Sequence, residues 1–269
     1  MRNFIVLLFL FSFIFPNQLF SQNPNETTYM VFDYMKIEPG KDQDYLELER
    51  AWKKINKAKV TEGILADWSL YKAVSPSGNL SEYNYITVNL LKGEKKLASY
   101  LEGNDMPKNW QSLVTKKELE LVNKTVEIRV KVKSEVWYYV DGYFEKDWTK
   151  NSNVFVLNYM KTKPGRSVSE HTQVERDIWL PVHEARVKGK SMTGWGVYNM
   201  MLPFGSEREY QCATLDAYLD MEQFLTSEYA KYFAQVYPDQ DLNELFSRTA
   251  EVVEINKGQV WIVVDRVDK

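Results

Sequence analysis

The side chain best suited to move a proton near neutral pH is His183, one of only two histidines in the 269 residues. An imidazole titrates close to neutral pH, so it can serve as a general acid or base. Trp179 lies one helical turn before His183 and Arg186 nearly one turn after it, which brings a ring and a cation to its side. This pattern predicts a proton-transfer site. The alternative is a half-exposed helical histidine without a catalytic role.

Motifs for other kinds of chemistry do not occur in the sequence. His171 is too distant from His183 for a short metal-binding spacing, and the single cysteine, Cys212, is distant from both. There is no glycine-rich phosphate loop, no Gly-x-Ser-x-Gly elbow and no Walker motif. We therefore expect no metal site and disfavour nucleotide binding and serine hydrolysis.

The chain contains two similar halves. The segment from Tyr34 to Gly40 returns as the segment from Tyr159 to Gly165. Further matched pairs follow in the same order: Trp52 and Trp179, Ala58 and Ala185, Trp68 and Trp195, Tyr71 and Tyr198, Tyr83 and Tyr210, Thr87 and Thr214, Trp137 and Trp261, Asp141 and Asp265. The order indicates one ancient duplication. The offset between matched residues drifts by only a couple of positions, and we expect the length differences to lie in loops.

Each half has the pattern of the same six elements. A β-branched and aromatic strand ends at Pro-Gly, a helix follows, then two strands, a helical stretch interrupted by proline, and a last strand. In the first half these are strand 29–35, a helix after Gly40, strands around Trp68 and Tyr85, helical 94–121 and strand 136–140. In the second they are strand 154–160, a helix containing Pro181, strands around Trp195 and Cys212, helical 221–248 and strand 260–264. This β-α-β-β-α-β order is the ferredoxin-like plan.

A ferredoxin-like unit covers one sheet face with helices and leaves the other bare, and a second copy can cover that bare face. The chain thus resembles the dimeric α+β barrel superfamily, with both sheets on one polypeptide. Its members include antibiotic-biosynthesis monooxygenases, haem-degrading monooxygenases, chlorite dismutases, muconolactone isomerases and polyketide cyclases. The resemblance implies an α+β fold of two tandem ferredoxin-like repeats, 28–144 and 153–269, forming an intramolecular barrel. A monomer is expected, because the internal partner replaces the dimer mate.

The resemblance also singles out Asn158. The haem-degrading branch carries a functional asparagine on its first strand about seven residues before the turn glycine, and Asn158 stands in that relation to Gly165. The first half has Asp33 there. The alternative is a polar strand residue bonded to its neighbours.

The haem ligand of that branch has no counterpart here. Phe224 and Leu225 resemble the residues that precede the haem-ligating histidine, but Ala234 stands at its expected position. Three tyrosines could in principle ligate instead: Tyr229, Tyr232 and Tyr237. We expect no cofactor.

Aromatic residues predict an apolar ligand site. The odd spacing of Trp195 and Tyr198 places them on opposite faces of a strand, one toward the helices and one toward the barrel interior. With Trp179 and Arg186 they are expected to surround a ligand in the barrel interior, mainly in the second half, because His183 is matched by Asn56 and Asn158 by Asp33. The alternative is plain core packing.

The beginning of the chain predicts export. Arg2 precedes an apolar run from Phe4 to Phe15, and Ser21 supplies a small residue for cleavage. We expect a signal peptide over 1–21 and a periplasmic or secreted mature protein; an uncleaved anchor is the alternative. No second apolar run of about 20 residues follows, so no membrane partner is expected after cleavage. The net charge of −3 without a basic stripe argues against nucleic acid.

Together these observations predict an exported protein that binds or processes a small, partly apolar molecule in a barrel interior. If it is an enzyme, the resemblance implies a cofactor-free monooxygenase-, isomerase- or cyclase-like activity. The rival prediction is a non-catalytic structural or interaction module of the cell envelope.

Overall fold

Eight antiparallel strands form a closed barrel in the order β1-β3-β2-β8-β5-β7-β6-β4. The computed structural model describes residues 26–74, 82–226 and 228–267, so the expected signal peptide over 1–21 lies outside the described residues. The strands are β1 (Thr28–Lys36), β2 (Asp67–Val74), β3 (Tyr85–Lys92), β4 (Val130–Phe144), β5 (Val154–Thr162), β6 (Gly194–Leu202), β7 (Cys212–Tyr218) and β8 (Val253–Arg266).

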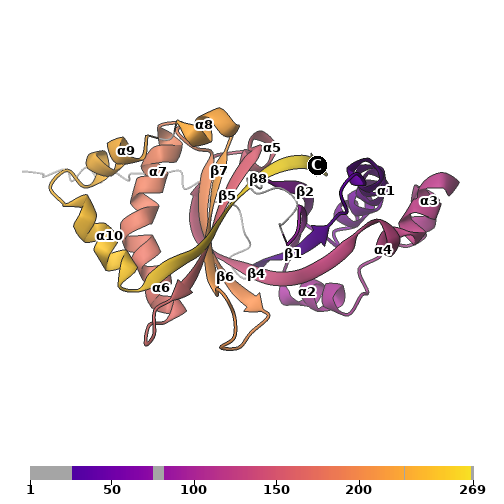
Figure 1. Cartoon of the computed structure of the whole chain (residues 1–269), viewed down its shortest axis with the longest axis horizontal. Helices are drawn as coiled ribbons and strands as arrows, with labels where there is room; N and C mark the ends of the chain where they lie inside the picture. Colours follow the sequence, from indigo (N-terminus) through magenta and orange to yellow (C-terminus); the bar gives the residue numbers. More distant parts are fainter. Residues whose placement is uncertain (1–25, 75–81, 227, 268–269) are drawn as a thin grey trace, which may run out of the picture.

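The helices lie in two groups on opposite sides of the barrel (Figure 1). One group is α1 (Asp42–Thr61), α2 (Glu94–Leu101), η2 (Trp110–Leu113), α3 (Lys116–Asn123) and α4 (Thr125–Ile128). The other is α6 (Val168–Val174), η3 (Glu175–Trp179), α7 (Leu180–Lys188), α8 (Met221–Leu225), α9 (Tyr229–Val236) and α10 (Leu242–Ala250), while α5 (Trp148–Asn151) joins the halves. Among the described helices, none has the length and apolar character needed to cross a membrane.

Both halves arrange their strands in the same way. The first half has the order β4-β1-β3-β2 and the second has β8-β5-β7-β6. The halves are joined by the pairs β2–β8 and β4–β6. This double pairing explains why β4 and β8 are much longer than the final strands predicted from local pattern, because each pairs within its own half and with the other half.

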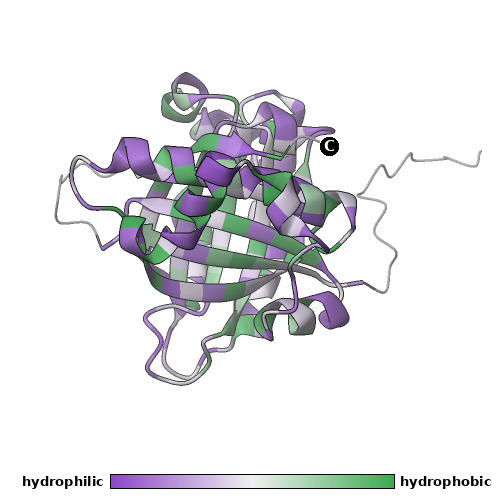
Figure 2. Ribbon diagram, turned by 90° about the vertical axis from the view of Figure 1, so that its right-hand side faces the viewer, coloured by the Kyte–Doolittle hydropathy of each residue, from purple (hydrophilic) through white to green (hydrophobic). Residues whose placement is uncertain are grey.

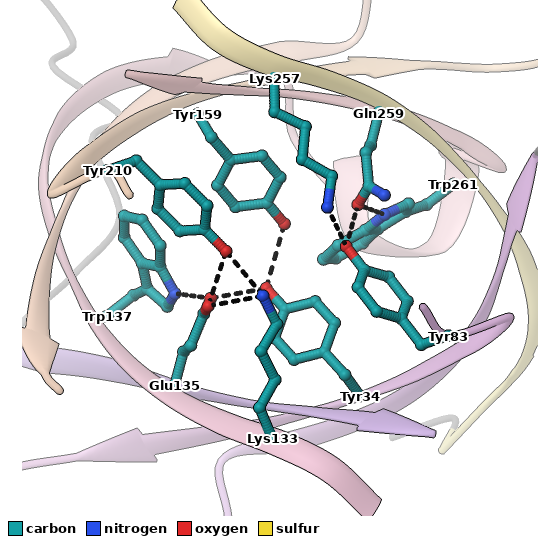
Figure 3. Close-up of polar contacts among 10 residues, drawn as sticks. All are labelled: Tyr34, Tyr83, Lys133, Glu135, Trp137, Tyr159, Tyr210, Lys257, Gln259 and Trp261. Atoms are coloured by element: carbon teal, nitrogen blue, oxygen red, sulfur yellow. Dashed lines mark hydrogen bonds and ion pairs between the residues drawn. The ribbon is translucent and has the colours of Figure 1, made fainter. Parts of the chain in front are cut away.

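The barrel interior is filled by side chains. Its core contains aromatic residues from both halves, including Phe32, Trp137 and Trp261. At one end, the Glu135 carboxylate accepts hydrogen bonds from Tyr34 Oη (2.7 Å), Tyr210 Oη (2.7 Å) and Trp137 Nε1 (3.1 Å), as Figure 3 shows. The cavity among the rings at the other end measures only about 80 Å³. The interior is therefore a core that joins the two halves.

Further apolar layers lie between the barrel and its helices. The ribbon in Figure 2 shows helices that carry both hydrophilic and hydrophobic residues over the strands. Trp68 packs in the helix-side core of the first half and Trp195 in that of the second. Tyr198 instead faces the barrel interior, as its odd spacing from Trp195 predicts.

Candidate functional site

A cavity lies outside the barrel, between the sheet of the second half and its helices. Its volume is about 480 Å³. It is lined by Asn158, Met160, Lys163, Glu175, Trp179, His183, Arg186, Trp195, Thr214, Asp216, Tyr218, Tyr229, Phe246, Thr249, Ala250, Val253, Glu254 and Ile255. Trp179 Nε1 donates a hydrogen bond to Thr249 Oγ1 at 3.0 Å, which ties η3 to α10 across one wall.

Most of the residues predicted from the sequence meet in this cavity. Asn158, Trp179, His183, Arg186 and Trp195 all line it. Tyr198 does not: it lies inside the barrel, with its ring 5.7 Å from that of Tyr139.

This placement corrects the expectation that these residues line the barrel interior. Asn158 follows Leu157 and precedes Tyr159, and both of these neighbours belong to the interior core. Because side chains alternate along a strand, Asn158 faces the helices. The polar residues therefore gather on the helix-covered face of the sheet, not on the face that closes the barrel.

His183 is buried against Trp195, with the ring centroids 4.5 Å apart and the rings nearly parallel at 8°. Arg186 Nη1 lies 3.2 Å from His183 Nδ1. A guanidinium can only donate, so Nδ1 is the acceptor and the neutral ring carries its proton on Nε2. Burial, and secondly the charge of Arg186, hold the pKa of His183 well below its usual value. At neutral pH His183 is thus uncharged, and its Nε2–H is a hydrogen-bond donor.

Asp216 is the titrating group that sequence reasoning missed. Asn158 Nδ2 donates to Asp216 Oδ2 at 3.3 Å and to Thr214 Oγ1 at 3.2 Å. Burial raises the pKa of Asp216 to about 6, against the lowering effects of the Arg186 charge and the Asn158 hydrogen bond. A carboxyl with this pKa can both accept and release a proton near neutral pH.

A signal for Asp216 was present in the repeat. Thr214 is matched by Thr87, and the residue two positions further on a strand shares its face. Two positions after the matched threonine, the first half has Asn89 and the second has Asp216. The two halves therefore differ in charge at this position.

A π-helical turn, η3, carries Glu175 and Trp179 to the cavity wall. Pro181, in the first turn of α7, has no N–H to donate to the carbonyl of Asp177, one helical turn earlier. The Tyr237 hydroxyl lies 2.9 Å from Asp177 O and 3.0 Å from Ile178 O and supplies a donor there. Such π-turns occur frequently at functional sites.

We expect Tyr237→Phe to lower the free energy of unfolding by about 1 kcal/mol, because the carbonyl oxygens at the π-turn lose their donor. Urea denaturation followed by circular dichroism measures this. Tyr229→Phe is the control, since the Tyr229 hydroxyl forms no hydrogen bond with any described residue, and it should change stability by less than about 0.5 kcal/mol. Equal stabilities for the two variants would contradict this account of the turn.

Tyr232, Tyr237, Ala234 and His183 do not fit haem ligation. Tyr232 Oη donates to Gly189 O at 3.1 Å, Tyr237 bonds the π-turn carbonyls, and Ala234 is exposed. A metal-bound histidine donates its second N–H to an acceptor, whereas His183 Nδ1 faces the donor Arg186. Within the described chain, no three His, Cys, Asp or Glu side chains are grouped to hold a metal ion. We derive no step through haem.

The first half has a smaller cavity of about 210 Å³ at the corresponding place, lined by Asp33, Asn56, Lys59 and Trp68 among others. Its polar groups form ion pairs and hydrogen bonds with other side chains of the first half. Lys59 Nζ lies 2.5 Å from Asp105 Oδ2, and Arg129 pairs with Glu49. Tyr100 Oη donates to Asp33 Oδ2 at 3.3 Å. The second-half cavity is therefore both larger and less occupied by its own ion pairs.

Comparisons with known proteins show the fold and nothing finer. No protein-family model matches the chain, and no curated protein matches it. A candidate monooxygenase from Fusobacterium nucleatum subsp. nucleatum superposes with TM-score 0.54 and 12% identity, covering 90% of this chain and 94% of the other. A candidate monooxygenase from Lactobacillus acidophilus superposes with TM-score 0.51 and 9% identity, covering 90% of this chain and 95% of the other. A candidate chlorite dismutase superposes with TM-score 0.50 and 12% identity, covering 89% of this chain and 95% of the other. The fold is thus that of the dimeric α+β barrels.

Proposed function

We propose that this protein binds a small, partly apolar molecule in the cavity of its second half, and that Asp216 exchanges a proton with it. The observation that carries the proposal is the convergence of Asp216, Arg186, Asn158 and His183 into one aromatic-walled cavity of about 480 Å³. Apolar walls with a few convergent polar groups are typical of small-molecule sites.

Each polar side chain has a distinct role in the proposal. Asn158 holds the Asp216 carboxyl by its amide hydrogen bond. Asp216 accepts a proton from the bound molecule or returns one, because its pKa of about 6 suits both directions. The Nε2–H of His183 donates to an oxygen of the ligand. As an enzyme, the protein would catalyse a cofactor-free isomerase-, cyclase- or monooxygenase-like reaction that begins with proton removal.

The proposal includes the origin of the site in a duplication of one ferredoxin-like unit, with repeats over 28–144 and 153–269. The identical strand order of the halves supports it. The segment from the buried Glu175 to Trp179 is one residue longer than the matching segment from the buried Glu49 to Trp52. One residue is the length that a π-turn adds to a helix. One step of the offset then lies in a helix, which differs from the expectation that all length differences lie in loops.

We further propose that the protein is exported after removal of residues 1–21, to the periplasm or the medium, and acts as a monomer without nucleic acid or membrane partners. The filled barrel interior favours one rival, a non-catalytic structural or interaction module of the cell envelope. The small-molecule protein and the structural module differ in whether the second-half cavity binds a ligand.

A neutral two-ring ketone, 2-acetylnaphthalene, tests for use of the cavity by isothermal titration calorimetry. We expect saturable binding that Ala250→Trp weakens by at least about tenfold, because Ala250 is an exposed residue on the cavity rim and a larger ring blocks entry. Asn158→Ala and His183→Ala should also weaken binding, since each removes a polar group that the cavity presents.

The matched first-half changes Asp33→Ala and Asn56→Ala are the controls and should leave binding unchanged. Once a turnover is found, Asp216→Asn should lower it on the order of a hundredfold or more. Absence of binding, or binding that none of the second-half changes affects, would favour the structural module.

A further inference from the structure

Arg186 is a buried cation whose hydrogen-bonding capacity is largely unused. Only 2% of its surface is exposed, and it lines the cavity. Nη1 donates to His183 Nδ1 at 3.2 Å and Nη2 to Tyr218 Oη at 3.1 Å, while Nε is enclosed without a partner. A guanidinium has five N–H donors and stays protonated in proteins, so this group is a fixed positive charge with donors to spare.

The two partners of Arg186 are neutral. Burial keeps His183 uncharged by lowering its pKa, and it raises the pKa of the Tyr218 hydroxyl above its usual value. In the described chain, no carboxylate oxygen lies within 4.0 Å of the Arg186 guanidinium. Asp216 lies close enough for the Arg186 charge to lower its pKa, but it forms no ion pair with Arg186. A buried charge without a counter-ion in contact is costly, by several kcal/mol per ion after relaxation.

The three acidic side chains in the same cavity have other partners, and Glu254 is paired with Lys163 at 2.5 Å. Asp216 accepts the Asn158 hydrogen bond and lies 3.9 Å from His183 Nδ1. Glu175 Oε1 lies 3.1 Å from His171 Nε2. None of these three carboxyl groups forms an ion pair with Arg186.

The first half treats its buried cations differently. Lys59, which matches Arg186 in the repeat, pairs with Asp105 at 2.5 Å, and Arg129 pairs with Glu49. Both cations around the smaller cavity thus have a carboxylate of the chain itself. In the larger cavity Lys163 likewise pairs with Glu254, and Arg186 is the cation that forms no ion pair with a described residue.

We infer that the ligand of the second-half cavity supplies this missing group: it carries a carboxylate that binds Arg186, attached to an apolar, ring-sized body. The inference rests on the proposed function and names its ligand class. Guanidinium and carboxylate are planar and match in a two-pronged arrangement, which favours a carboxylate over a neutral oxygen. The Arg186 guanidinium carbon lies 4.9 Å from the centre of the Tyr229 ring, and Trp179 and Trp195 offer aromatic surface for the body of the ligand.

Charge in the cavity gives this ligand a pH signature. Asp216, Glu175 and the Lys163–Glu254 ion pair share the cavity with Arg186. An ionised Asp216 repels a ligand carboxylate. Binding is therefore favoured when Asp216 is protonated. Affinity for a carboxylate should fall as the pH rises from 5 to 8, whereas affinity for a neutral ligand should stay constant.

The experiment compares 2-naphthoate with 2-naphthamide, which has the same rings and a neutral head group, by calorimetry on the full chain. The wild type should bind the carboxylate at least about tenfold more tightly at pH 5.5, in line with hydrogen bonds to charged groups. Arg186→Met should remove this preference and leave amide binding within about threefold. Lys188→Met, on the exposed side of the same helix, controls for net charge and should keep the preference.

The outcomes separate the two proposals. If both naphthalenes bind with equal affinity, or if the preference survives in Arg186→Met, the carboxylate inference is overturned while the small-molecule site stands. If neither compound binds and 2-acetylnaphthalene also fails, the proposed function itself fails. Circular dichroism of Arg186→Met establishes that the variant is folded, and Arg186→Lys, which keeps the charge but loses the planar fork, should retain part of the preference.

Discussion

Asp216→Asn is expected to raise the free energy of unfolding at pH 8 by about 3 kcal/mol. Burial raises the pKa of Asp216 to about 6, from about 3.8 in the unfolded chain. Between these values the folded protein binds the proton more tightly than the unfolded chain, so stability from this group falls as the pH rises through the interval. Above pH 6 the ionised carboxylate destabilises the fold by the full difference of about two pKa units. An amide removes that penalty.

A pH series of urea denaturation curves checks this expectation. The gain from Asp216→Asn should be near its maximum at pH 8 and close to zero at pH 4. His183 has the opposite slope, because its lowered pKa makes the fold less stable as the pH falls, but its effect largely cancels in the difference between variant and wild type. A gain of the same size at both pH values would instead indicate a packing effect.

The repeat offers a reciprocal control. Asn89 occupies the matching, buried position in the first half. Asn89→Asp should therefore lower stability at pH 8 and matter little at pH 4. The second half thus has a carboxylate that lowers stability where the first half has an amide. This pattern is expected of a group that is retained for function.

Glu135→Leu is expected to cost more than about 3 kcal/mol of folding stability. The Glu135 carboxylate accepts from the hydroxyls of Tyr34 and Tyr210 and from Trp137 Nε1, and Lys133 Nζ lies 3.2 Å from it (Figure 3). Leucine fills similar space without any acceptor. Each enclosed donor left without a partner costs about 1–3 kcal/mol. Because Tyr34 also bonds Tyr159 of the other half at 3.1 Å, the loss should loosen the junction between halves.

Glu135→Gln is the matched comparison for this prediction. The second half has Gln259 in the equivalent cluster, where its Oε1 accepts from Tyr83 Oη at 2.5 Å and Trp261 Nε1 at 3.1 Å. Glutamine at 135 keeps one acceptor, so we expect a loss of about 1 kcal/mol. Equal losses for Leu and Gln in urea denaturation would mean that the hydrogen bonds of this cluster contribute little.

The order of elements could be predicted because it depends on local pattern. Alternating strands, turn-forming Pro-Gly pairs and the repeated aromatic landmarks are properties of short segments. The extent of β4 and β8 was underestimated, since part of their length is held by pairing with the other half. Pairing between distant segments leaves no mark on the local periodicity of either strand.

Taken alone, the sequence determined the α+β element order, the opposite faces of Trp195 and Tyr198, and the candidates Asn158, His183 and Arg186, because residue type and spacing carry that information. Only the tertiary structure decided that these candidates meet outside the barrel, with His183 as a donor and Asp216 as the titrating group. Protonation depends on burial and on neighbours brought together from different strands and helices. A cavity likewise depends on how loosely helices cover a sheet face, and neither property belongs to any one segment of the chain.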